Sequence, residues 1–237
     1  MSKLLLIVLT FCTFTHLVYG SVPIDTINIS YGDLKIDQLL IGSTTYLTYT
    51  KHNQGKMMQM QLWHRKTSLL NDRILVEQIW EGEDSTKNRE LYSLSEKADF
   101  SPLFHSVDFG DKIEAYDFHE GRIAASDSVA LNTRAGFERS LPESCFNFEL
   151  DLEILQTLPY ENGKTYLINF YHPGGKSAPQ QYAYQVTAFD ETSQCWMVDI
   201  DYPQGSSARF WVHSEQHTVI KMQESYGPIQ RYKILLP

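Results

Sequence analysis

The segment YAYQVTAFDETSQCWMVDID, residues 182–201, shows the pattern that recurs along most of this chain. Tyr182, Tyr184 and Val186 alternate with smaller or polar residues, so they occupy one face of an extended strand. Trp196 and its alternate neighbours repeat the pattern after a polar stretch. Two alternating runs separated by polar turn residues predict a β-hairpin.

Short segments of the same kind recur, bounded by Gly, Pro, Asn and Asp. They predict strands at 46–50, 58–64, 74–80, 90–94, 112–118, 122–126, 165–171, 182–187, 195–200, 209–212, 218–224 and 229–235. Met58, Met60 and Leu62 are expected on the buried face of their strand. About a dozen strands with one apolar face must curl, close or be covered. The fold class is therefore β-dominated: a large curved antiparallel sheet, either a half-barrel or an open barrel.

Residues 147–158, NFELDLEILQTL, depart from the strand pattern. Apolar residues, Phe148 and Leu152 among them, fall close to helical spacing. Asn147 is a favourable N-cap, acidic residues follow it, and Pro159 ends the run. The segment predicts one helix that covers the sheet.

The first twenty residues have the features of a secretory signal peptide. Lys3 precedes an apolar stretch, and Gly20 provides a small residue at the predicted cleavage site. The apolar stretch is too short to span a membrane as a helix. We expect a periplasmic or secreted protein, not transmembrane after cleavage, with residues 21–237 forming a single β-rich domain.

The charge of the chain is acidic and dispersed. It has 20 Lys and Arg against 29 Asp and Glu, a formal net charge of −9 at pH 7. Such a surface repels phosphate backbones, so we expect no nucleic-acid partner.

Two cysteines, Cys145 and Cys195, remain after the predicted cleavage. In an oxidising compartment they could form a disulfide, and the alternative is two buried free thiols. The sequence leaves both possibilities open.

Two histidines, His213 and His217, lie four residues apart with Glu215 between them. A zinc peptidase helix needs H-E-x-x-H, whereas the order here is H-S-E-Q-H. The flanking residues favour strands, so residues 214–216 predict a three-residue hairpin turn. We expect no metal and no cofactor.

Motifs for hydrolysis do not stand out. Ser43, Ser177 and Ser206 lack the G-x-S-x-G pattern of a nucleophile elbow. Cys145 and His172 could meet as nucleophile and base, and no local pattern supports that pairing. We therefore expect a protein that is not an enzyme.

Aromatic residues carry more information. Four tryptophans lie within predicted strands: Trp63, Trp80, Trp196 and Trp211. They either fill the core or line an apolar cavity in a curved sheet, where Met58 and Met60 would supply an adaptable lining. The second reading predicts a lipid or another apolar molecule as the ligand.

Several phrases of the sequence resemble a known family. They are ELYSLSEKADFSPLFHS (90–106), KIEAYDFHEGRI (112–123), the helix ending in Leu-Pro, and the C-terminal strands. With them the chain resembles a family of exported Gram-negative bacterial proteins known only as a domain of unknown function. More distantly, it is similar to the periplasmic lipoprotein-carrier half-barrels of the LolA and LolB type.

The resemblance implies an open, curved antiparallel sheet wrapped partly around a helix or loop. In the carriers that concavity shelters acyl chains, and the family supplies no catalytic residues. The predicted function is binding or carriage of an apolar, lipid-like ligand in the cell envelope. The alternative is an interaction module that docks an envelope protein and holds no small molecule.

Overall fold

The computed structural model describes residues 25–52, 55–202 and 205–237. The predicted signal peptide and its cleavage site after Gly20 lie outside these ranges. Among the described residues, no helix is long and apolar enough to cross a membrane.

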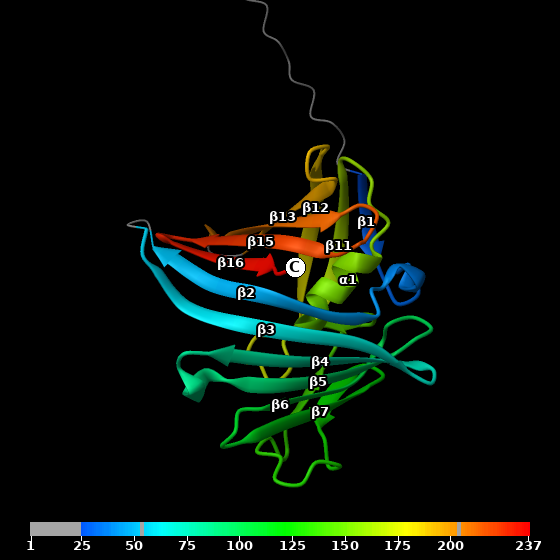
Figure 1. Ribbon diagram of the computed structural model, residues 1–237. Helices are drawn as coiled ribbons and strands as arrows, with labels where there is room; N and C mark the ends of the chain where they lie inside the picture. The colour runs from blue at the N-terminus through cyan, green and yellow to red at the C-terminus, as the bar shows by residue number, and fades with distance from the viewer. Residues whose placement is uncertain (1–24, 53–54, 203–204) are drawn as a thin grey trace, which may run out of the picture.

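The fold is one large curved sheet with a single short α-helix against its concave side (Figure 1). Its first strands are β1 (Asp25–Ile29), β2 (Gly42–His52), β3 (Met57–Leu70), β4 (Arg73–Gly82), β5 (Arg89–Glu96), β6 (Pro102–Asp108), β7 (Ile113–His119) and β8 (Arg122–Ala125). The others are β9 (Glu138–Ser140), β10 (Cys145–Asn147), β11 (Lys164–Tyr171), β12 (Gln180–Asp190), β13 (Cys195–Asp201), β14 (Ser207–His213), β15 (Val219–Tyr226) and β16 (Ile229–Leu235). The predicted β-dominated, curved and mainly antiparallel fold is confirmed, and the sheet stays open rather than closing into a barrel.

The order of the strands joins two series of hairpins. One series runs from β11 to β16 and the other from β2 to β9, and β16 pairs antiparallel with β2 between them. At the far edge, β1 and β10 both pair in parallel with β11, at successive positions along it. The C-terminal strand therefore lies in the middle of the sheet.

Each predicted strand overlaps an observed one, and β1, β6, β9 and β10 were not predicted. β6 shows why: it begins at Pro102, and its other buried residue is His105, at 1% exposure. A histidine on the inner face breaks the apolar alternation by which a strand is recognised. Its Nδ1 lies 2.8 Å from Ser93 Oγ on β5, which satisfies the imidazole inside the sheet.

The predicted helix is confirmed, with a shorter α-helical part. Asn147 Oδ1 accepts a hydrogen bond from Glu149 N at 3.0 Å, which caps the 3₁₀ turn η3 (Phe148–Leu150). The α-helix α1 (Asp151–Thr157) follows. All its residues are buried, polar ones included, so it is inserted into the concavity rather than laid across its mouth.

The two faces of β3 are reversed with respect to the prediction. Met60 and Leu62 lie on the outer face and are 49% and 38% exposed. Trp63 and Arg65 are buried on the inner face. Gln59, at φ +54°, stands where the pairing of β3 with β2 shifts register. Period-two alternation identifies a strand without saying which face turns inward.

Cys145 and Cys195 are both free and buried, which is the alternative to the disulfide. Cys145 begins β10 and Cys195 begins β13, with β11 and β12 between them. Three strand spacings of about 4.8 Å already separate the two strands by roughly 14 Å. A disulfide requires Cα atoms within about 7 Å, so this sheet order keeps the thiols apart.

A small second core holds the β7–β8 hairpin against β10 and β11. It consists of Tyr116, Phe118, Ile123, Cys145 and Tyr171. Gly174, in the β11–β12 connection, lies against it with φ +76°. A Cβ there would come within 2.0 Å of Tyr116 Oη, so only glycine fits this approach.

Candidate functional site

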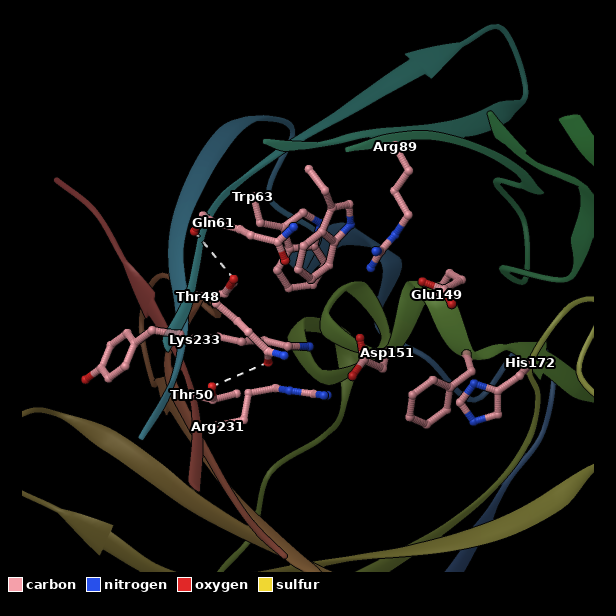
Figure 2. A pocket seen from close by; sticks show the side chains of 14 residues that line it. Thr48, Thr50, Gln61, Trp63, Arg89, Glu149, Asp151, His172, Arg231 and Lys233 are labelled. Atoms are coloured by element: carbon pink, nitrogen blue, oxygen red, sulfur yellow. Dashed lines mark hydrogen bonds between the residues drawn. The ribbon is translucent and has the colours of Figure 1, made fainter. Parts of the chain in front are cut away.

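A cavity of about 310 Å³ lies between α1 and the inner face of the sheet (Figure 2). Its lining comes from β2, β3, β4, β5, β16, the start of the helical segment and the end of β11. The residues are Thr48, Tyr49, Thr50, Gln59, Gln61, Trp63, Trp80, Arg89, Phe148, Glu149, Asp151, His172, Arg231 and Lys233. The volume suits a small molecule or a head group, and most of the lining is polar.

A buried hydrogen-bond network attaches the helix to the sheet beside the cavity. Arg65 Nε donates to Glu153 Oε1 at 3.0 Å, and its Nη2 forms an ion pair with the same carboxylate. Arg65 Nη1 and Trp63 Nε1 both donate to Gln78 Oε1 at 3.0 Å. Gln78 Nε2 donates in turn to the Glu149 carbonyl at 2.9 Å. The network fixes Glu149 and the α1 segment relative to β3 and β4.

Three cationic side chains from the sheet line the cavity, and Figure 2 shows Arg89 near Glu149 and apart from the other two. Arg231 and Lys233 are two residues apart on β16, so they project from the same face. Lys233 Nζ lies 4.4 Å from the Trp63 ring centroid, and the Arg89 guanidinium lies 4.4 Å from that of Trp80. Burial lowers the pKa of Lys233 and also that of Arg89.

These cations have few anionic partners. Within the described ranges, Arg231 pairs with Glu224 at 3.3 Å, while Lys233 and Arg89 make no ion pair within 4.0 Å. The indole Nε1 of Trp80 is buried without a hydrogen-bond acceptor in the described part of the chain. The cavity is thus lined by two cationic side chains without a close carboxylate partner and by an indole whose N–H has no acceptor.

The side of the cavity opposite Arg231 and Lys233 is acidic and comes from the helical segment. Asp151 is only 6% exposed, and Glu149 is half-buried. Burial, together with the negative charge of Asp151, raises the pKa of the Glu149 carboxyl. Figure 2 shows Arg231 and Lys233 extending toward Asp151. Among the residues that the structure describes, no ion pair within 4.0 Å joins the two sides.

An aromatic pair forms another part of the lining. Phe148 lies against His172 with ring centroids 3.9 Å apart and also contacts Tyr182. Trp63 and Trp80 stack with centroids 4.4 Å apart. The cavity therefore presents flat apolar surfaces as well as charges.

The structure separates the six residues predicted for an apolar cavity. Trp63 and Trp80 line the cavity beside α1, Trp196 packs against the main core, and Trp211 lies in a groove formed by β13, β14 and β15. Met60 borders a surface depression near the β4–β5 connection. Neither Met60 nor Met58 lines the cavity of the two tryptophans.

The remaining sequence candidates lie away from this cavity. His213 and His217 flank a hairpin turn, as predicted, and His213 Nδ1 accepts hydrogen bonds from Glu215 N and Gln216 N. Cys145 is buried in the small second core, and burial raises its thiol pKa to about 12.

The charged residues of the cavity were not predicted from the sequence. One signal for them was present: polar residues at period two on strands that are apolar on the other face, as in Arg231 and Lys233 around Tyr232. Thr48 and Thr50 on β2 follow the same rule. Which of these faces turned inward could only be read from the assembled sheet.

Comparison with known proteins gives a family and a similar solved structure. Residues 45–234 match the family described as "Protein of unknown function (DUF3108)". A crystal structure from Bacteroides fragilis, described as a putative exported protein with YmcC-like fold, is similar at 8% identity and a TM-score of 0.27. The similarity covers 87% of this chain and 98% of that one. No curated protein matches the chain.

Proposed function

Because this chain belongs to the DUF3108 family, whose function is unknown, we propose from the cavity itself that it is an exported, non-enzymatic protein that binds a small ligand through an anionic group. The observation that carries the proposal is the convergence of Arg89, Arg231 and Lys233 on one cavity with few carboxylate partners. Guanidinium and ammonium groups are the side chains that proteins use to bind carboxylates and phosphates.

The energetics of burial support this choice. Taking a charge out of water without a partner is costly. Among the described residues, Lys233 has the face of Trp63 and the more distant carboxylates of Asp151 and Glu224 to compensate it, and no ion pair within 4.0 Å. An anion bound between the cations would remove that cost. The unpartnered Nε1 of Trp80 could donate one further hydrogen bond to it.

The absence of a catalytic role is part of the proposal. The Cys145 thiol is buried, and its raised pKa keeps it protonated, which disfavours a nucleophile. The one close serine–histidine pair in the core, Ser93 with His105, is buried at 0% and 1% exposure. A substrate would have to unfold the sheet to reach it.

Export and periplasmic localisation rest on residues 1–20 and remain part of the proposal. The apolar, lipid-like ligand is a second candidate, favoured by the stacked rings of Trp63 and Trp80 in the cavity wall.

The test begins with native mass spectrometry of the protein purified from its own cells, followed by extraction and identification of any adduct. Titration calorimetry with phosphate and carboxylate compounds then measures affinity, with tryptophan fluorescence as a second readout because Trp63 and Trp80 line the cavity. A lipid adduct without an acidic group would favour the second candidate. No adduct and no anion binding would refute the proposal.

The matched variants are Lys233→Met and Lys66→Met. Lys233 lies in the cavity, whereas Lys66 is exposed on the outer face of β3 and pairs with Glu77. We expect Lys233→Met to weaken anion binding at least tenfold, since a charge-assisted hydrogen bond is worth about 1.5–3 kcal/mol. Lys66→Met should leave the affinity unchanged. Equal affinities for the two variants would contradict a site at Lys233.

An envelope docking module is the other candidate. Met60, Leu62 and Ile79 are exposed on the outer face of β3 and β4, where apolar side chains could contact a partner. Co-purification of a stoichiometric protein that is lost in a Leu62→Ser variant would support this candidate instead.

A further inference from the structure

The anionic ligand of the proposed function should also carry a positive charge, because the cavity has an acidic side facing its basic one. This inference rests on the proposed function and adds the chemical class of the ligand. We infer that the cavity recognises a zwitterion, a molecule with a primary ammonium group a few atoms away from a phosphate or carboxylate.

Asp151 provides the first observation. Asp151 is more than nine-tenths buried and lines the cavity. Figure 2 shows it between Lys233 and His172. Within the described residues its carboxylate accepts no hydrogen bond and makes no ion pair, in contrast to Glu153 on the same helix, which is fully paired with Arg65. A carboxylate that lines an enclosed cavity without a protein donor is a group that a bound cation would satisfy.

Glu149 provides the second observation, because it adds a carboxylate beside Asp151 on the same side of the cavity. Two neighbouring carboxylates repel each other, and a purely anionic ligand would increase this repulsion. A ligand with an ammonium group at one end and an acidic group at the other would meet opposite charges on both sides. Among the described residues no ion pair within 4.0 Å joins the two sides, and the cavity that they line has a volume of about 310 Å³.

The third observation is the contrast with the rest of the helix. Arg65 occupies the Glu153 carboxylate completely, so the acidic charge of α1 is already neutralised on the side that faces β3. Among the described residues, the carboxylates of the helical segment that remain unpaired are those of Glu149 and Asp151, which line the cavity. The free charges of the helical segment and of β16 are therefore turned toward the same enclosed space.

The test compares pairs of ligands that differ only in the ammonium group. 2-Aminoethyl phosphate is compared with propyl phosphate, and 3-aminopropionate with butyrate, by titration calorimetry on the full mature chain. We expect the amino compound of at least one pair to bind at least tenfold more tightly, since its ammonium forms charge-assisted hydrogen bonds to Asp151 and Glu149. The preferred pair distinguishes a phosphate ligand from a carboxylate ligand.

Binding to vesicles distinguishes two sources of an aminoethyl phosphate group, a lipid head group and a free molecule. Binding to phosphatidylethanolamine vesicles but not to phosphatidylglycerol vesicles would identify a lipid head group. Binding of soluble 2-aminoethyl phosphate without vesicle binding would identify a free molecule. Both results keep the zwitterion, and a preference for phosphatidylglycerol would contradict it.

Asp151→Asn should remove the preference for the amino compound and leave propyl phosphate binding unchanged or tighter, because a repulsive charge is lost. Glu149→Gln tests the same side at a half-buried position in case Asp151→Asn fails to fold, which circular dichroism would reveal. Glu81→Gln, exposed on the outer face of β4, is the matched control and should change neither affinity.

The outcomes of the two proposals can be told apart. Equal binding within both pairs, or an equal loss of the amino compound and its matched anion in Asp151→Asn, would overturn the zwitterion and leave the anion site intact. Failure of all four compounds to bind would overturn both proposals.

Discussion

The inner and outer faces of β3 do not divide into an apolar inside and a polar outside. The inner face places Arg65 in a buried ion pair, with Gln61 in the polar cavity, whereas the outer face exposes Met60 and Leu62. The difference shows that this concavity is not simply a hydrophobic core: part of it is a polar site supported by a helix. The apolar side chains of Met60 and Leu62 lie on the outside.

The largest effect should come from breaking the inner ion pair. Arg65→Met leaves the Glu153 carboxylate buried without its partner, which typically costs about 3–5 kcal/mol. The adjacent Lys66 forms an exposed pair with Glu77 on the outer face, and Lys66→Met should cost less than about 1 kcal/mol. Urea unfolding of both variants measures the difference.

A double variant sharpens this test. Arg65→Met combined with Glu153→Met should recover much of the lost stability, because an apolar pair can replace a buried ion pair without a desolvation cost. If the single and double variants were equally unstable, the loss would come from packing rather than from the unpaired charge.

The next largest effect should come from buried His105 as the pH is lowered, with His64 on the outer face as its control. Burial lowers the pKa of His105 to about 3, whereas an unfolded chain takes up the proton near pH 6.5. The folded protein binds fewer protons between these values, so its stability falls as pH falls, by up to about 1.4 kcal/mol per pH unit. Between pH 6.5 and 4.5 the expected loss from His105 is about 2–3 kcal/mol.

His105→Gln should flatten this part of the pH profile, and His64→Gln on the outer face should preserve it. Urea unfolding at several pH values gives the profile. A slope that persists unchanged in His105→Gln would mean that other groups cause the acid sensitivity.

The smallest effect belongs to the outer face itself. Leu62→Ser should change the free energy of unfolding by no more than about 0.5 kcal/mol, because the side chain is already partly in water. Thermal unfolding checks it. A loss of 2 kcal/mol or more, which is the scale of large-to-small changes in a core, would show that this face is covered in solution.

Much of the fold was predictable because local patterns decide it. The alternation around Tyr182 and Trp196 gives the β12–β13 hairpin, and Asn147 with Pro159 marks both ends of the helical segment. The turn between His213 and His217 followed from three polar residues between two runs of aromatic and β-branched residues. All these signals lie within a few residues of one another.

The site was less predictable because it depends on contacts between distant segments. Arg65 and Glu153 are 88 residues apart, and nothing near either one in the sequence indicates the other. Trp63 and Trp80 were identified as candidates because aromatic residues are conspicuous, whereas Lys233 and Asp151 resemble ordinary surface charges. The inward face of each strand is decided by the whole sheet, through bulges such as the one at Gln59.

The central position of β16 has a consequence for when the cavity forms during folding. β16 pairs with β15 on one side and β2 on the other, and it supplies both Arg231 and Lys233 to the cavity. Before residues 229–235 are available, the two series of hairpins cannot share a sheet, and the cavity lacks two of its three cations. Such distant pairings form slowly. Completion of the sheet and completion of the cavity are therefore one event.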